Sequence, residues 1–160
     1  MRLVSWNVNG IRAAIRKGID GYFQSIDADI WMLQEVRALP EQLPKNWDWP
    51  DGYATFMHTA EKKGYSGVAT LSRTPMEIIS TGKKSVVDPN DSEGRIITSK
   101  HGDLLCINTY LPSGSSGAER QHYKEQWMAE WREYLQEYVS IETPVIVCGD
   151  LNIAHTEDDI

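Results

Sequence analysis

Cysteine is scarce in this chain, and long apolar runs are missing from it. The 160 residues include two cysteines, Cys106 and Cys148. Both fall inside short apolar runs, so we expect reduced, buried thiols rather than a disulfide framework. No stretch approaches the roughly 18 uncharged apolar residues of a membrane-spanning helix, and the opening residues form no secretory leader. These absences predict a cytoplasmic protein with no membrane partner.

Positive charge is also in short supply. Sixteen Lys and Arg residues stand against 23 Asp and Glu, which gives a net charge of −7 and a pI near 5.1. A general nucleic-acid coat protein needs a basic face, so the composition argues against that class. A basic rim around an acidic centre would still let DNA bind. The basic residues do cluster locally, at Arg12, Arg16 and Lys17, at Lys62 and Lys63, and at Arg120.

The chain does contain four short apolar runs, each of which ends in polar residues. Such runs are typical of buried strands, and they cover Leu3–Asn7, Ile30–Glu35, Leu104–Tyr110 and Val145–Asp150. If the four strands lie side by side, their ends bring two carboxamides, two carboxylates and a phenol to one sheet edge. These side chains are Asn7, Glu35, Tyr110, Asp150 and Asn152.

The remaining patterns predict an α/β protein. Helical spacing of apolar residues favours a helix over 11–27, interrupted near Gly18 and Gly21, and a second helix over 118–139 whose aromatic stripe we interpret as a core face. Shorter elements are strands over 67–72 and 76–80, a hairpin of 95–100 with 103–110 turning at His101-Gly102, and a loop over 38–58.

The polar ends suit the hydrolysis of a phosphodiester. A hard divalent ion can neutralise the phosphate and activate a water, and Mg²⁺ needs one or two carboxylates. Glu35 is the best single ligand, followed by Asp150 and Asn152, which share a face in extended backbone while Leu151 turns to the core. We predict that Asp150 orients or deprotonates the water and that Tyr110 donates a hydrogen bond to developing charge.

Each of these residues also has a plain structural interpretation. Asn7 could form a turn at a strand end, Glu35 could be the first solvated residue of a loop, and Tyr110 could be a packed strand residue. His58, His101 and His122 have no obvious acidic partner in the sequence, and we interpret His155 as structural rather than catalytic.

Six motifs in order resemble the exodeoxyribonuclease III family of apurinic/apyrimidinic (AP) endonucleases, within the endonuclease/exonuclease/phosphatase superfamily. They span nearly the whole chain and comprise Ser5-Trp-Asn-Val-Asn-Gly-Ile-Arg12, Leu33-Gln-Glu35, Gly64-Tyr-Ser-Gly-Val68, Glu93-Gly-Arg95, Tyr110-Leu-Pro112 and Gly149-Asp-Leu-Asn-Ile-Ala-His155.

The resemblance implies a four-layered α/β sandwich, dependence on Mg²⁺ or Mn²⁺, and cleavage of double-stranded DNA on the 5′ side of abasic sites, together with removal of blocking groups or nucleotides from 3′ ends. By the same resemblance, Asn7, Glu35, Asp150 and Asn152 form the metal site, and Tyr110, Asp150 and Asn152 are catalytic. The matching contacts with the DNA backbone are Arg12, Lys17, Gly64, Tyr65 and Arg120.

The chain departs from the family's pattern at three points. Asn9 replaces an aspartate of some relatives, and Ser113 replaces an asparagine near the phosphate. Motifs that end in a Ser-Asp-His with the catalytic histidine have no match here. We therefore expect residues 1–160 to be the N-terminal portion of a single domain, which by itself associates or stays molten because one sheet is partly uncovered.

Two other functions stay open at this point. One is a different phosphodiesterase of the superfamily, acting on RNA, inositol phosphates or sphingomyelin. The other is a DNA-binding fragment without catalysis, because the terminal histidine is missing. The motifs Gly64–Val68 and Asn7–Arg12 favour the DNA branch.

Overall fold

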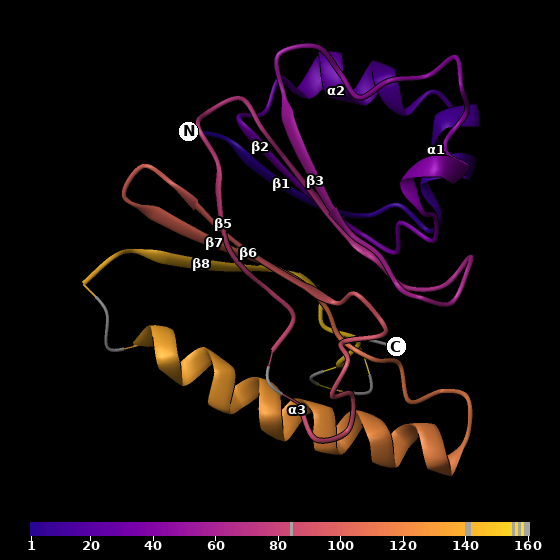
Figure 1. Cartoon of the computed structure of the whole chain (residues 1–160), viewed down its shortest axis with the longest axis vertical. Coiled ribbons are helices and arrows are strands. Elements are labelled where there is room, and N and C mark those ends of the chain that lie inside the picture. Colours follow the sequence, from indigo (N-terminus) through magenta and orange to yellow (C-terminus); the bar gives the residue numbers. More distant parts are fainter. Residues whose placement is uncertain (84, 140–141, 155, 157, 159–160) are drawn as a thin grey trace.

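The computed structural model describes residues 1–83, 85–139, 142–154, 156 and 158. These residues form two four-stranded sheets, and Figure 1 shows α1 and α2 outside one sheet and α3 outside the other. The predicted four-layered α/β fold is thereby confirmed. In chain order the elements are β1 (Leu3–Asn7), α1 (Ile11–Arg16), α2 (Ile19–Ile26), β2 (Ile30–Gln34), the 3₁₀ turn η1 (Pro40–Gln42), β3 (Ala54–His58), β4 (Val68–Ser72), β5 (Glu77–Thr81), β6 (Ile96–His101), β7 (Leu104–Tyr110), α3 (Ala118–Val139) and β8 (Val145–Asp150).

The first sheet has the order β1-β2-β4-β3. Strands β1 and β2 are parallel, because the chain crosses between them through α1 and α2 on the outer face. The two helices are separated at Gly18, whose φ of 82° lies in the left-handed region, so the predicted interruption is confirmed there. The second predicted break, at Gly21, is wrong, because Gly21 lies within α2. Phe23 of α2 packs edge-on against Trp31 of β2, with ring centroids 4.9 Å apart. This outer core fixes the helices to the sheet.

The second sheet has the order β5-β6-β7-β8. Strands β7 and β8 are parallel, and the 22-residue α3 forms their crossover. The aromatic stripe of α3 lies on the sheet, where Trp127 and Tyr134 are buried with Ile96 and Ile107. The prediction that this stripe is a core face is confirmed.

The layer between the two sheets combines apolar and amide side chains. Ile30, Met32 and Cys106 pack there. Both cysteines are free thiols as expected, but only Cys106 is buried and Cys148 is half-buried. Beside them, the buried Gln34 donates from Nε2 to Oδ1 of Asn108 at 2.8 Å, and Nδ2 of Asn108 donates to the Ala69 carbonyl at 2.8 Å. Because buried amides need partners, this pair fixes how the two sheets sit on each other.

The structure corrects three expectations from the sequence. The four apolar runs do not share a sheet, because β4 occupies the place beside β2 and β6 the place beside β7. Residues 38–58 are not all loop, since Ala54–His58 pairs as an edge strand with β4. The hairpin turns at Gly102-Asp103, one residue later than predicted, because His101 still pairs with Leu104.

A fourth correction concerns His58, which does have an acidic partner. Its Nε2 lies 2.9 Å from Oδ2 of Asp91, and its Nδ1 lies 3.0 Å from the carbonyl oxygen of Ile96. This pair could not be predicted from the sequence, because Asp91 lies in a loop that is 33 residues from His58 along the chain. Within the described residues, no helix is both long and apolar enough to cross a membrane.

Candidate active site

The carboxyl ends of two parallel strand pairs meet at one end of the sandwich. Asn7 is in register with Gln34 at the ends of β1 and β2, and Tyr110 is in register with Asp150 at the ends of β7 and β8. In each sheet, therefore, the polar residues at the ends of the two parallel strands lie side by side. The convergence that we predicted along one sheet is achieved across two.

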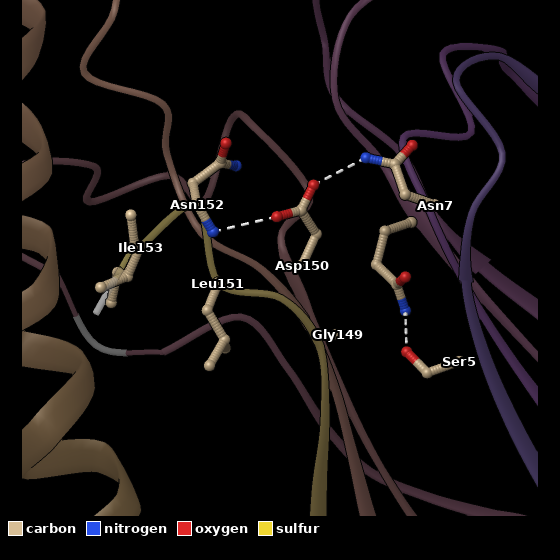
Figure 2. A pocket seen from close by; sticks show the side chains of 9 residues that line it. Ser5, Asn7, Gly149, Asp150, Leu151, Asn152 and Ile153 are labelled. Carbon is tan, nitrogen blue, oxygen red and sulfur yellow. Dashed lines mark hydrogen bonds between the residues drawn. The ribbon is translucent and has the colours of Figure 1, made fainter. Parts of the chain in front are cut away.

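Two side-chain hydrogen bonds join these ends across the sheets. The phenol of Tyr110 donates to Oε1 of Glu35. The Nδ2 group of Asn7 donates to Oδ2 of Asp150 at 2.7 Å, as Figure 2 shows. A side-chain hydrogen bond from Asn7 also helps to lower the pKa of Glu35. Side-chain hydrogen bonds therefore join four of the five predicted site residues, Glu35 with Tyr110 and Asn7 with Asp150.

The backbone that presents Glu35 is held in an unusual conformation. Glu35 and Arg37 have φ values of 53° and 51°, in the left-handed region that non-glycine residues seldom adopt. The Glu35 carbonyl accepts from the Gly10 amide at 2.7 Å, and the Arg37 amide donates to the Ser66 carbonyl at 2.8 Å. Such conformations persist only where the surroundings enforce them, and they cluster at functional sites.

Glu35 is surrounded by hydrogen-bond donors. Burial by itself raises the pKa of this carboxyl, but the bonds from Tyr110 and Arg37 outweigh burial and hold the pKa below its usual range. Arg37 contributes a contact of 2.9 Å between its Nη2 and Oε1 of Glu35. The carboxylate is therefore charged at neutral pH, as a ligand for a cation must be.

Tyr110 is a proton donor rather than a nucleophile in this setting. Burial, followed by the hydrogen bond to Glu35 and the charge of that carboxylate, raises the pKa of the phenol far above its usual value. The hydroxyl hydrogen is consequently retained at neutral pH. A retained phenolic hydrogen can stabilise negative charge on a neighbouring oxygen.

Asn152 closes the turn that follows β8. Its backbone amide donates to Oδ1 of Asp150 at 2.9 Å, and its Nδ2 donates to the Leu111 carbonyl at 2.7 Å. Its φ of 48° ends the extended strand, so the simple alternation that we expected breaks down. Leu151 does not turn into the core as predicted, since its side chain is 40% exposed and points away from Asp150 in Figure 2.

A cavity of about 470 Å³ opens beside these residues. All five predicted site residues line it: Asn7, Glu35, Tyr110, Asp150 and Asn152. Two further arginines, Arg37 and Arg95, also line it, and we assigned no role to them from the sequence. Arg37 could have been found by its spacing of two from Glu35. Arg95 stands in a quoted motif, but only the fold shows that it faces this cavity. Ser66, Ser113, Ser115 and Ser116 complete the polar wall.

The predicted DNA contacts divide into two groups. Gly64, Tyr65 and Arg120 line the same cavity as the polar strand ends. Arg12 is exposed on α1, and the exposed Lys17 lines a separate hollow of about 210 Å³. The contact of all five residues with DNA stays a prediction. His155, which we interpreted as structural, lies outside the described residues.

The sequence and the fold are similar to those of known proteins. Residues 4–160 match the model of the Endonuclease/Exonuclease/phosphatase family. The chain belongs to this family. The predicted resemblance is confirmed by relatives that carry the names exodeoxyribonuclease and AP endonuclease.

Three members of the family illustrate the similarity. An exodeoxyribonuclease of Bacillus subtilis is 39% identical over the whole chain, which spans 62% of that protein. An AP endonuclease structure from Archaeoglobus fulgidus is 30% identical with a TM-score of 0.82, and it aligns with all of this chain and 60% of its own. A 3′-5′ exonuclease structure from Neisseria meningitidis is 26% identical with a TM-score of 0.86, covering 99% of this chain and 60% of its own. The chain thus spans about three fifths of these relatives.

The donor set of this family member suits a hard divalent ion. The cavity offers the carboxylates of Glu35 and Asp150 with the carboxamides of Asn7 and Asn152, and Mg²⁺ prefers a small number of such oxygen ligands with several waters. Among the residues that the structure describes, no three His, Cys, Asp or Glu side chains gather as a ligand cluster. The residues present fit Mg²⁺ or Mn²⁺ better than a thiolate- and imidazole-bound ion.

Proposed function

We propose that this chain carries the metal-dependent phosphodiesterase site of a DNA-repair nuclease. The proposed reaction incises double-stranded DNA on the 5′ side of abasic sites and removes blocking groups or nucleotides from 3′ ends. The observation that carries the proposal is the joining of Glu35 to Tyr110 and of Asn7 to Asp150 across two sheets. A cytoplasmic location, and the assignment of residues 1–160 to the N-terminal portion of one domain, stay predictions from the sequence.

In this proposal Asn7, Glu35, Asp150 and Asn152 hold Mg²⁺ or Mn²⁺. The ion supplies charge neutralisation at the phosphate and a bound water of lowered pKa. Asp150 orients the attacking water or accepts its proton, because its carboxylate is fixed by Asn7 at 2.7 Å and by the Asn152 amide at 2.9 Å. A fixed carboxylate of this kind is what general-base action requires.

The remaining groups act on the phosphate. The protonated Tyr110 donates a hydrogen bond to developing negative charge. Arg37 and Arg120 place positive charge on the wall of the cavity, which supports binding of a phosphodiester in a protein whose net charge is −7. The left-handed loop residue Gly64, with a φ of 74°, lets the backbone beside Tyr65 approach a DNA strand closely. Arg37 and Arg120 thus concentrate positive charge at the cavity, next to Gly64 and Tyr65.

The proposal is tested on the protein in its full natural length. Its substrates are a DNA duplex with one tetrahydrofuran abasic analogue and an undamaged duplex with a recessed 3′ end, each with Mg²⁺ or with EDTA. We expect a single Mg²⁺-dependent cut 5′ to the analogue and slower removal of 3′ nucleotides.

Three outcomes would contradict the proposal. Cleavage that persists in EDTA would show that the reaction does not depend on a metal ion. Hydrolysis of RNA, an inositol phosphate or sphingomyelin with both DNA substrates left intact would favour another phosphodiesterase. Duplex binding without turnover, unchanged by Mg²⁺, would favour a DNA-binding protein without catalysis.

A further inference from the structure

Arg95 is an almost completely buried arginine next to the cavity. It directly precedes β6, and its side chain is 2% exposed. Arginine is rarely buried without a specific partner, so the partners of this guanidinium indicate what it does. A side chain with so little exposed surface is also poorly placed to contact a phosphate directly.

Arg95 forms hydrogen bonds with both the carbonyl and the amide of the Tyr110 backbone. Nη1 of Arg95 donates to the Tyr110 carbonyl at 2.7 Å, and the Tyr110 amide donates to the Arg95 carbonyl at 2.9 Å. The guanidinium also lies over the Tyr110 ring, 4.8 Å from its centroid, within the range of a cation–π interaction. The backbone and the ring of Tyr110 are therefore both held by one residue.

The guanidinium is itself fixed by a charged partner. Nε of Arg95 donates to Oε2 of Glu93 at 2.7 Å. Burial would raise the pKa of Glu93, but Arg120 and Arg95 lower it to about 2, so the carboxylate stays charged. Such charge-assisted bonds are short and directional.

The glycine between Glu93 and Arg95 is required by the packing. Gly94 has a φ of 57°, and a Cβ atom built there would lie 2.6 Å from the carbonyl carbon of Thr59. Only glycine accommodates this backbone and this close approach. The Glu-Gly-Arg sequence is thus a compact support in which Arg95 lines the cavity and Glu93 holds its guanidinium.

Glu93 and Arg95 also bind two of the predicted DNA contacts, Tyr65 and Arg120. Nη2 of Arg120 donates to Oη of Tyr65 at 2.6 Å and to Oε2 of Glu93 at 2.9 Å. Nη2 of Arg95 donates to the same Tyr65 hydroxyl at 3.2 Å. Arg95 therefore stands between the residues that would touch the DNA backbone and the phenol that would act at the phosphate.

We propose that Arg95 is a positioning residue that holds the Tyr110 phenol against Glu35 and couples it to Tyr65 and Arg120. The proposal rests on the proposed phosphodiesterase function. Arg95 acts through Tyr110 and does not contact the phosphate. Arg95 donates from three nitrogens of one rigid plane to Glu93, the Tyr110 carbonyl and the Tyr65 hydroxyl. The single nitrogen of a lysine ammonium cannot reach three acceptors spread in this way, so charge alone does not replace the guanidinium.

The kinetic test is a double-mutant cycle in the full-length protein with the abasic duplex. We expect Arg95→Lys to lower kcat by about 10- to 100-fold, the range that a small misplacement of a reacting group produces, and to change KM by less than about twofold. In a Tyr110→Phe background, Arg95→Lys should cost less than about twofold more. Equal losses of kcat in both backgrounds would overturn the proposal, because independent sites add.

The matched control is Arg73→Lys. Arg73 also pairs with a carboxylate, Asp27, and also lies over a tyrosine ring, at 4.6 Å from the centroid of Tyr53. It belongs to neither the cavity nor the predicted DNA contacts, so kcat and KM should both be unchanged. If Arg95→Lys does not fold, Glu93→Gln is used instead, and the same loss of kcat is expected from the loosened guanidinium. The value of KM is not a criterion for this variant, because Glu93 also binds Arg120.

A structural test separates this inference from the proposed function. In a crystal structure of the Arg95→Lys variant, or of Glu93→Gln, we expect the hydrogen bond between the Tyr110 phenol and Glu35 to be lost. Its retention would overturn the positioning role whether or not the protein cleaves DNA. Its loss in a protein that cleaves no phosphodiester would support the positioning role while the proposed function fails.

Discussion

The unit formed by β1, α1, α2 and β2 differs from the unit formed by β7, α3 and β8 in the segment that joins its strands. The first crossover consists of helices of 6 and 8 residues that separate at Gly18, whereas the second is one helix of 22 residues. Both nevertheless produce a parallel pair whose last residues are in register. The strand pairing, and not the crossover, therefore sets where the polar groups lie.

The two units also supply different chemistry. The first provides Asn7 and Glu35, whose side-chain oxygens are suited to a cation. The second provides Tyr110, Asp150 and Asn152, which suit proton transfer and hydrogen bonding to a phosphate. Neither set is complete alone, and the hydrogen bonds from Tyr110 to Glu35 and from Asn7 to Asp150 are what unite them.

The largest expected effect comes from removing the carboxylate of the second unit. Asp150→Asn keeps the size of the side chain but loses the acceptor charge, so we expect kcat for abasic incision to fall by about 10³-fold, within the usual range for a general base. Steady-state kinetics in Mg²⁺ measures it. Asp51→Asn, an exposed acid in another part of the chain, is the control. A loss below tenfold would show that the second unit does not carry the chemistry.

A smaller effect is expected at the contact between the sheets, away from the site. Asn108→Leu removes the Oδ1 acceptor of Gln34 and the side-chain donor to the Ala69 carbonyl, while Gln34 keeps its bonds to Ser5 and Met32. We therefore expect the free energy of unfolding to fall by about 1–3 kcal/mol. Urea denaturation measures it, with the exposed Asn46→Leu as control. An unchanged midpoint would mean that the buried amides do not hold the two units together.

The smallest effect is expected at His58, which joins β3 to the loop before β6. Both of its ring nitrogens face acceptors, Asp91 and the Ile96 carbonyl, so both must donate and the ring is protonated. Although burial lowers its pKa, Asp91 and the Ile96 carbonyl raise it above the ordinary value. The resulting stability is fully present below pH 6.5 and is lost as the pH rises through the raised pKa.

His58→Gln should accordingly destabilise the protein more at pH 6 than at pH 8.5. We expect a loss of about 1–2 kcal/mol at pH 6, as for hydrogen bonds to a charged group. Thermal unfolding at the two pH values measures it, and the exposed His122→Gln serves as control. A larger loss at the higher pH would contradict the protonated state that the geometry indicates.

The sequence predicted those parts of the fold that depend on local patterns. The range of α3 and its buried aromatic stripe followed from helical spacing, and β1, β2, β7 and β8 followed from apolar runs. The strand β3 was missed because its residues are only half-buried at a sheet edge and follow a segment rich in loop residues. Edge strands depend on pairing with a neighbour, which a local pattern does not record.

The site was predicted as a set of residues but not as an arrangement. Strand ends identified Glu35 and Asp150, yet the grouping into two facing sheets depends on which strands pair, and this is non-local. Arg95 was missed for the same reason, since its role depends on a contact with Tyr110, 15 residues away. Arg37 was missed although its spacing of two from Glu35 is a local signal. Burial of an arginine can be seen only in the folded protein.

The proposed function requires that a divalent ion be held between the two units. Electron paramagnetic resonance of Mn²⁺ binding to the full-length protein tests it without relying on catalysis. We expect Glu35→Gln from the first unit and Asp150→Asn from the second each to weaken Mn²⁺ binding by about tenfold or more, while the exposed Glu61→Gln leaves it unchanged. A dissociation constant that stays the same in either of the first two variants would contradict a shared site.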